Sequence, residues 1–242
     1  MIDFHTHIIP GIDDGSHTVT ESIEMLKMSY AQGIDTVILS SHFRLGEHKI
    51  KTYLKDRQDR LDMIREALTD EDRKLIPKVI LGCEIEYNSS INSWDYIGEL
   101  AIKGTNYVMT EMPFIPWSKE VVRNIDRIAL GTPFTPILPH IDRYFHTFTK
   151  ETYIRHYFDM PEVLLQMNAI YINNVRNVPY FKPLFDDGTI DLIGSDCHGT
   201  EWRPQDLGRA IKVLRELCGQ ETLDRIDKLG REIIKDAIYE EM

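Results

Sequence analysis

The sequence lacks the features that would assign it to a membrane-spanning or secreted class. Its 242 residues include only three cysteines, an odd number whose spacing matches no zinc-finger framework. No apolar run approaches the roughly 18 residues that a membrane-spanning helix needs. The first residues have neither the basic nor the apolar region of a signal peptide. We therefore expect a cytoplasmic protein with reduced thiols and no membrane insertion.

Positive charge is also scarce, because 28 lysines and arginines stand against 39 aspartates and glutamates. The resulting formal charge of −11 argues against sequence-independent binding to nucleic acid, which needs clustered basic residues. Hydrophobic residues make up 42% of the chain and charged residues 28%, which is typical of a globular protein rather than a disordered one. No repeat or Ser/Gly-rich linker marks a boundary. The prediction is a single domain over residues 1–242.

Short apolar runs alternate with amphipathic helix patterns along the chain. The runs predict seven buried strands, at residues 2–4, 37–40, 79–81, 107–109, 137–138, 163–165 and 190–193. Stripes at helical spacing predict buried helix faces formed by Ile23, Leu26 and Tyr30, by Leu61, Ile64 and Leu68, and by Leu207, Ala210, Ile211 and Leu214. This alternation favours an α/β fold with a mainly parallel sheet. A small (β/α) barrel is the first choice and an open doubly wound sheet the second.

The C-terminal segment also has an amphipathic pattern, carried by Ile226, Ile233, Ile234 and Ile238. A helix with this pattern can pack on the barrel or on a second copy of the chain. The sequence does not choose between the two, so an oligomer stays open.

Six of the seven predicted strands end in residue types that bind metal ions. In chain order these residues are His5 and His7, His42, Glu84, Glu111, His140, and Asp196 with His198. The carboxyl ends of strands in barrels and open α/β sheets face one site, so these residues would converge. His5-x-His7 is the strongest single element, because alternation along a strand places both imidazoles on one face.

A single histidine or glutamate after a strand is most often a polar loop residue, but six such endings at one sheet edge predict a metal site. With Asp14, the set contains five histidines and four carboxylates. Nine ligands are too many for one ion and suit two or three ions that share a bridging carboxylate. Imidazole and carboxylate ligands without cysteine are typical of Mn, Fe or Zn in an open catalytic site. Three divalent ions against four carboxylates leave about +2, which favours a phosphate monoester as substrate.

The motifs that carry these residues occur in a fixed order: His5-x-His7, Asp13-Asp14-Gly15, Ser41-His42, and residues 82–87, 139–143 and 195–198. In this order they resemble the PHP (polymerase and histidinol phosphatase) superfamily. Within it, they resemble the bacterial protein-tyrosine phosphatases of capsule and exopolysaccharide clusters. The resemblance implies a distorted, TIM-like (β/α)7 barrel with metals at the carboxyl ends of the strands. It also implies a manganese-dependent enzyme, with iron or zinc as alternatives, that acts on a phosphotyrosyl protein such as a tyrosine kinase with a Tyr-rich tail.

By position, the resemblance assigns the residues to three metal sites. It implies that His5, His7, Glu84 and Asp196 hold one ion, that Glu84, Glu111 and His140 hold a second, and that Asp14, His42 and His198 hold a third. Arg44, Arg143 and Arg203 match arginines near the family's site, where a guanidinium fork suits phosphate oxygens. Residues 111–117 and 166–171 depart from the family's common forms, which concerns the substrate more than the metals.

Four other functions compete with this interpretation. A small-molecule phosphatase of the histidinol-phosphatase type would use the same metals. A metal-dependent amidohydrolase also begins with His-x-His, but the carbamylated lysine typical of those enzymes has no counterpart here. Cys197 and Arg203 satisfy Cys-x5-Arg, the pattern of thiol-dependent tyrosine phosphatases, although Asp196 and Glu201 place negative charge near that thiol. A non-catalytic regulator that has kept its metals is the last alternative.

Overall fold

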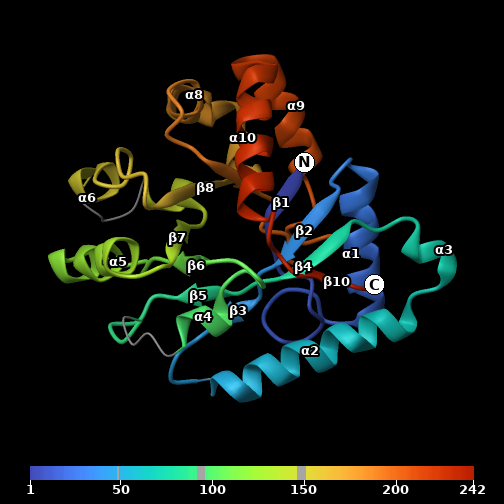
Figure 1. The fold of residues 1–242 in the computed structure, drawn as a ribbon. Helices are drawn as coiled ribbons and strands as arrows, with labels where there is room; N and C mark the ends of the chain where they lie inside the picture. The colour runs from blue at the N-terminus through green and yellow to red at the C-terminus, as the bar shows by residue number, and fades with distance from the viewer. Residues whose placement is uncertain (48, 92–95, 146–150) are drawn as a thin grey trace.

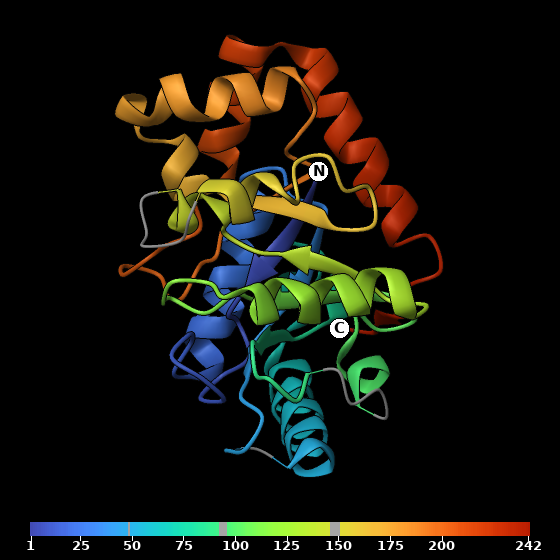
Figure 2. The same ribbon diagram turned by 90° about the vertical axis from the view of Figure 1, so that its left-hand side faces the viewer.

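The computed structural model describes residues 1–47, 49–91, 96–145 and 151–242 (Figure 1). A curled parallel sheet forms the centre, and helices surround it in both views (Figures 1 and 2). Its strands are β1 (Ile2–Thr6), β2 (Thr36–Leu39) continued by β3 (His42–Phe43), β4 (Lys78–Leu81) continued by β5 (Glu84–Glu86), β6 (Tyr107–Glu111), β7 (Thr135–Leu138), β8 (Leu164–Asn168) and β9 (Leu192–Gly194). Each of the seven predicted strands is present, and the α/β barrel class is confirmed.

Two of the strands are interrupted, and this distorts the barrel. Ser40 and Ser41 separate β2 from β3, while Gly82 and Cys83 separate β4 from β5. As a result, one sheet has the order β1-β2-β4-β10 and the other the order β3-β5-β6-β7-β8-β9. The short strand β10 (Tyr239–Glu240) pairs antiparallel with β4, on the side of β4 away from β2. The C-terminal segment therefore adds a strand beside β4, at the edge of the first sheet.

The first and last parallel strands, β1 and β9, meet at the edge of the barrel where the strands have their carboxyl ends. The amide of Asp196 donates to the carbonyl of His5 at 2.8 Å, and the amide of His7 donates to the carbonyl of Cys197 at 3.0 Å. Thr6 and Cys197 form an isolated parallel bridge. These contacts bring the segment after β9 directly beside the end of β1.

The helices and short helical turns lie outside the sheet. They are α1 (Val19–Ala31), α2 (Ile50–Ala67), α3 (Asp70–Arg73), α4 (Ile97–Leu100), α5 (Lys119–Gly131), η1 (Ile141–Tyr144), α6 (Glu151–Arg155), α7 (Ala169–Ile172), η2 (Val175–Asn177), α8 (Val178–Asp186), α9 (Leu207–Cys218) and α10 (Gln220–Ile233). None of the helices in the described ranges is long and apolar enough to cross a membrane.

Two of the helix predictions need correction. Tyr30 does not share the buried face of α1, because 45% of it is exposed while Met25 and Ser29 are buried. The C-terminal helix ends at Ile233, so Ile238 lies beyond it and is exposed. In both cases a purely apolar pattern missed the true face or end of the helix.

The interior of the barrel is apolar along the strands, before their carboxyl ends are reached. Phe4, Ile38, Ile80 and Met109 belong to one buried cluster, which Ile233 at the end of α10 also joins. The predicted stripes of α2 and α9 are buried in the larger cluster that joins the sheet to the helices. The buried isoleucines of α10 therefore pack on the barrel of their own chain.

Candidate metal centre

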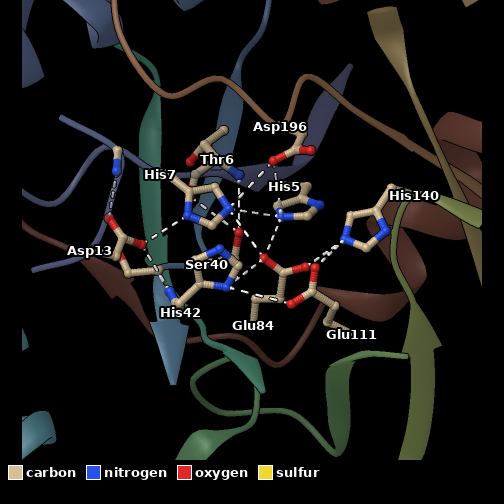
Figure 3. Close-up of polar contacts among 12 residues, drawn as sticks. His5, Thr6, His7, Asp13, Ser40, His42, Glu84, Glu111, His140 and Asp196 are labelled. Carbon is tan, nitrogen blue, oxygen red and sulfur yellow. Dashed lines mark hydrogen bonds and ion pairs between the residues drawn. The ribbon is translucent and has the colours of Figure 1, made fainter. Parts of the chain in front are cut away.

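All nine residues predicted as metal ligands meet at the carboxyl ends of the strands. Figure 3 labels seven of them, all except Asp14 and His198. Their ligand atoms form four overlapping groups, in each of which all the atoms lie within 4.8 Å of one another. The groups are His7 with Asp14, His42 and His198; His5 with His7 and Asp196; His5 with Glu84 and His140; and His42 with Glu84 and Glu111. The convergence predicted from the strand ends is therefore present in the fold.

Glu84 lies at the middle of the cluster and uses both of its oxygens (Figure 3). Its Oε2 is 3.0 Å from His5 Nε2 and 3.2 Å from His42 Nδ1. Its Oε1 is 2.8 Å from His140 Nε2. A carboxylate that faces imidazole nitrogens on both sides in this way has the placement of a ligand that bridges two metal ions.

The four groups differ in detail from the three ligand sets that the resemblance implies. His7 joins Asp14, His42 and His198, and His42 also lies with Glu84 and Glu111. The implied pair of His140 and Glu111 is close as well, with Nε2 3.3 Å from Oε1. The assignment of each residue to a particular ion stays a prediction.

Local backbone features aim these side chains. The register between β1 and β2 shifts between Asp3 and Thr6, so β1 contains a bulge next to His5. A bulge redirects the side chains beside it, and His5 Nε2 lies 3.0 Å from His7 Nε2. A Cβ on Gly15 would lie 2.2 Å from the carbonyl oxygen of His7, and only glycine permits that approach. The loop that carries Asp14 therefore packs directly against His7.

Three non-glycine residues at the centre have a positive φ angle. The φ angles are 38° for His140, 55° for Asp196 and 47° for Arg203, and no other non-glycine residue in the described ranges has one. Backbone of this kind costs free energy and persists where the surrounding structure enforces it, most often at functional sites.

Asp13 supports the centre, although the prediction assigned it no role. Its Oδ2 accepts a hydrogen bond from His7 Nδ1 at 2.8 Å and from the amide of His42 at 2.9 Å. Since Nδ1 of His7 carries the proton in this contact, Nε2 is free to act as a ligand. The position beside Asp14 in the Asp-Asp-Gly motif was the available signal.

Strand β8 ends in amides rather than in ligand types, and these amides also support the centre. Gln166 Oε1 accepts from the amide of His140 at 2.8 Å and lies 3.3 Å from His5 Nδ1. Asn168 Nδ2 donates to Asp196 Oδ2 at 2.7 Å. Both side chains orient neighbours of the cluster, as outer partners of metal ligands do.

The donor set fits bound divalent ions. His5 and His7 direct Nδ1 at Gln166 and Asp13, so the two Nε2 atoms that lie 3.0 Å apart both present lone pairs. Nδ1 of His42 is buried and makes no hydrogen bond within the described part of the chain, although Oε2 of Glu84 lies 3.2 Å from it. Facing lone pairs and a buried nitrogen of this kind need a cation between or beside them.

The carboxylates hold positive charge at the cluster. Burial alone would lower the pKa of His140, but Glu111 and Glu84 outweigh it and raise that pKa to about 9. Burial would raise the pKa of Asp196, yet His5, Arg143 and the neighbouring cations hold it well below its usual range. The site is therefore a strongly attractive environment for cations.

Two of the three predicted arginines reach the cluster. Arg143 and Arg203 both donate through a terminal nitrogen to Oδ2 of Asp196. Arg203 Nη1 also lies 3.0 Å from His198 Nε2. Arg44 lies farther out, where its Nε donates to Glu86 at 2.7 Å, and its side chain is 45% exposed.

Cys197 is fully buried beside the centre rather than presented to a substrate. Burial raises the pKa of its thiol well above the usual range, and the charges of Asp3 and Asp196 add to that effect. A thiol in such surroundings is poorly suited to become the thiolate that nucleophilic catalysis needs.

The comparison with known families decides the assignment. Residues 1–232 match the family model described as capsular polysaccharide synthesis, CpsB/CapC. The chain belongs to the CpsB/CapC family. Known relatives of this CpsB/CapC chain include the tyrosine-protein phosphatase CpsB of Streptococcus pneumoniae. It is 24% identical, and the match covers 90% of this chain and 91% of the relative. The tyrosine-protein phosphatase YwqE of Bacillus subtilis (strain 168) is 25% identical and covers 91% of this chain and 86% of the relative.

Solved structures agree with the CpsB/CapC fold. A structure described among YwqE from Bacillus subtilis and CpsB from Streptococcus pneumoniae, "unique metal-dependent tyrosine phosphatases", superposes with a TM-score of 0.74 at 22% identity, over 98% of this chain and 96% of the other. An amidohydrolase 2 from Bifidobacterium longum subsp. infantis reaches a TM-score of 0.52 at 12% identity, over 97% of this chain and 98% of the other. At 12% identity, the second likeness concerns the fold alone.

Proposed function

We propose that this chain is a metal-dependent protein-tyrosine phosphatase. The observation that carries the proposal is the position of Asp196 between two kinds of partner. Its Oδ1 lies 3.5 Å from Nε2 of both His5 and His7, while its Oδ2 accepts from Arg143 and Arg203. Metal ligands and phosphate-binding arginines thus meet at one carboxylate. The names of the relatives, tyrosine-protein phosphatases CpsB and YwqE, support the same activity.

The cluster would hold two or three divalent ions, with manganese first and iron or zinc as alternatives. The proposed ligands are His5, His7, Asp14, His42, Glu84, Glu111, His140, Asp196 and His198. Such ions, when bound, supply Lewis acidity toward phosphate oxygens and bring the pKa of water close to neutral. Imidazole and carboxylate donors without cysteine suit these metals.

The residues of the chain would bind and orient the phosphate. Arg143 and Arg203 would place their guanidinium forks on its oxygens, and Arg44 would approach from the rim. A tyrosine phenolate has a pKa of about 10 and leaves without strong assistance, so a dedicated general acid is not required. Gln166 and Asn168 would keep His5 and Asp196 in place during the reaction.

The protein partner would be a tyrosine kinase with a Tyr-rich tail, dephosphorylated in the cytoplasm. The family description, capsular polysaccharide synthesis, supports a substrate from that machinery. The three cysteines are free thiols, as a reducing compartment allows. Residues 1–232 match one family model, which supports a single domain over residues 1–242.

The test is metal analysis combined with turnover of a phosphotyrosyl peptide and of histidinol phosphate. We expect turnover of the peptide, its loss on chelation and its return when Mn²⁺ is added back. A strong preference for histidinol phosphate would favour a small-molecule phosphatase instead. If no metal restores turnover of either substrate, the chain is a binding protein rather than an enzyme.

Replacing Cys197 with serine separates the metal mechanism from a thiol mechanism. Because the thiol is buried and its pKa is raised, we expect kcat/KM for the peptide to stay within about threefold of the wild type. Loss of a nucleophile would instead lower turnover by roughly 10⁴-fold or more. A loss of that size in the folded, metal-loaded Cys197→Ser variant would overturn the proposal.

A further inference from the structure

Two exposed aromatic side chains border the candidate metal centre. Phe114 follows β6 and is 47% exposed, and Trp202 lies between β9 and α9 and is 62% exposed. Neither holds a metal ion or a phosphate oxygen in the proposed chemistry. Large aromatic rings left in solvent beside a site commonly mark a binding surface.

Phe114 is held in place by its surroundings. Its ring lies 6.0 Å from the ring of His140 and 5.6 Å from that of Tyr144, at interplanar angles of 26° and 28°. The hydroxyl of the buried Tyr144 donates to the carbonyl of Met112 and accepts from its amide, both at 3.0 Å. Trp117 Nε1 donates to the carbonyl of Pro113, also at 3.0 Å. Hydrogen bonds therefore hold the backbone immediately before Phe114, which positions its ring beside His140 and Tyr144.

Trp202 borders the opposite end of the row of histidines. Its ring meets the ring of His198 edge-on, at 5.6 Å and 89°. His198 in turn stacks on His7 at 4.0 Å, whereas His140 lies beside His5 at 5.5 Å. The two exposed rings thus contact the outermost histidines of the cluster.

Each ring also faces one of the two arginines of the centre. The guanidinium carbon of Arg143 lies 5.9 Å from the centroid of Phe114, and that of Arg203 lies 5.4 Å from the centroid of Trp202. Both arginines converge on Oδ2 of Asp196. A phosphate held by these arginines would therefore lie close to the two rings.

We propose that Phe114 and Trp202 select aryl phosphate esters over alkyl ones. The inference rests on the proposed function, since it assumes that this site binds phosphate monoesters. A phenyl ring on the ester oxygen reaches past the arginines and can stack against either ring or meet it edge-on. A short alkyl group gains no such contact. The rings could also act only on the arginines through cation–π contacts, and in that case their loss would weaken all phosphate esters equally.

The test compares two inert ligands, phenylphosphonate and methylphosphonate, by calorimetric titration of the metal-loaded protein. In Phe114→Leu and in Trp202→Leu we expect phenylphosphonate affinity to fall roughly three- to tenfold, with methylphosphonate affinity unchanged. The kcat/KM for a phosphotyrosyl peptide should fall in parallel. Tyr180→Leu is the matched control, because its side chain is exposed and lies on α8, outside the proposed surface.

The outcomes separate the inference from the function beneath it. Equal weakening of both phosphonates, or no weakening of either, would overturn the selection of aryl esters while leaving an active phosphatase. A different outcome is that the wild type turns over no phosphotyrosyl peptide while the two variants bind phenylphosphonate less tightly than the wild type does. In that case the proposed function fails and the aryl site stands.

Discussion

Replacing Glu84 with glutamine is expected to lower kcat/KM for a phosphotyrosyl peptide by about 10³-fold or more. The side chain keeps its size but loses the charge that lies within 3.3 Å of His5, His7, His42 and His140. A neutral amide cannot bridge two cations, so the metal content per chain should fall by at least one ion. Turnover and elemental analysis of the same preparation measure the two effects together.

Glu120→Gln provides the control for this variant. Glu120 is exposed in the first turn of α5 and belongs to none of the groups of possible metal ligands. Glu120→Gln therefore makes the same change of charge outside the cluster. Circular dichroism establishes that both variants are folded. Full metal content with turnover within about tenfold of the wild type in Glu84→Gln would contradict the bridging role.

The location of the centre could be predicted because it depends on simple regularities. Apolar runs mark the strands, parallel strands end at one edge, and the residue after each run is read directly from the chain. The residue types at those ends, such as Glu84 and His140, then indicate metal chemistry. The resemblance added the arginines, of which Arg143 and Arg203 reach the cluster and Arg44 stays at the rim in an ion pair with Glu86.

The supporting residues could not be predicted in the same way. Gln166 and Asn168 are amides at a strand end, and an amide carries no pattern that separates an oriented partner from an ordinary buried polar residue. The bulge in β1 and the breaks in two strands arise from how neighbouring strands fit together, which no local run records. The prediction that Tyr30 lies on the buried face of α1 was wrong for a related reason. Small residues such as Ser29 can occupy a buried helix face when the facing surface is close.

Removing the guanidinium of Arg143 or Arg203 is the second change with a large expected effect. Arg143→Ala and Arg203→Ala should each lower kcat/KM for the peptide by about 10²-fold, because each removes a charged donor that we propose binds the phosphate. The double variant should lose less than the product of the two, since both side chains converge on Oδ2 of Asp196. Metal content should stay at the wild-type level, which distinguishes this loss from that of Glu84→Gln.

Arg44→Ala is the matched comparison, because it removes the same group from the rim. Its ion pair with Glu86 is exposed, so the variant should fold normally and lose less than about tenfold in kcat/KM. Phosphate binding by Arg143 and Arg203 would be contradicted if their alanine variants kept wild-type affinity for methylphosphonate. A larger loss in Arg44→Ala than in either of them would place the phosphate near Arg44, in the segment after β3.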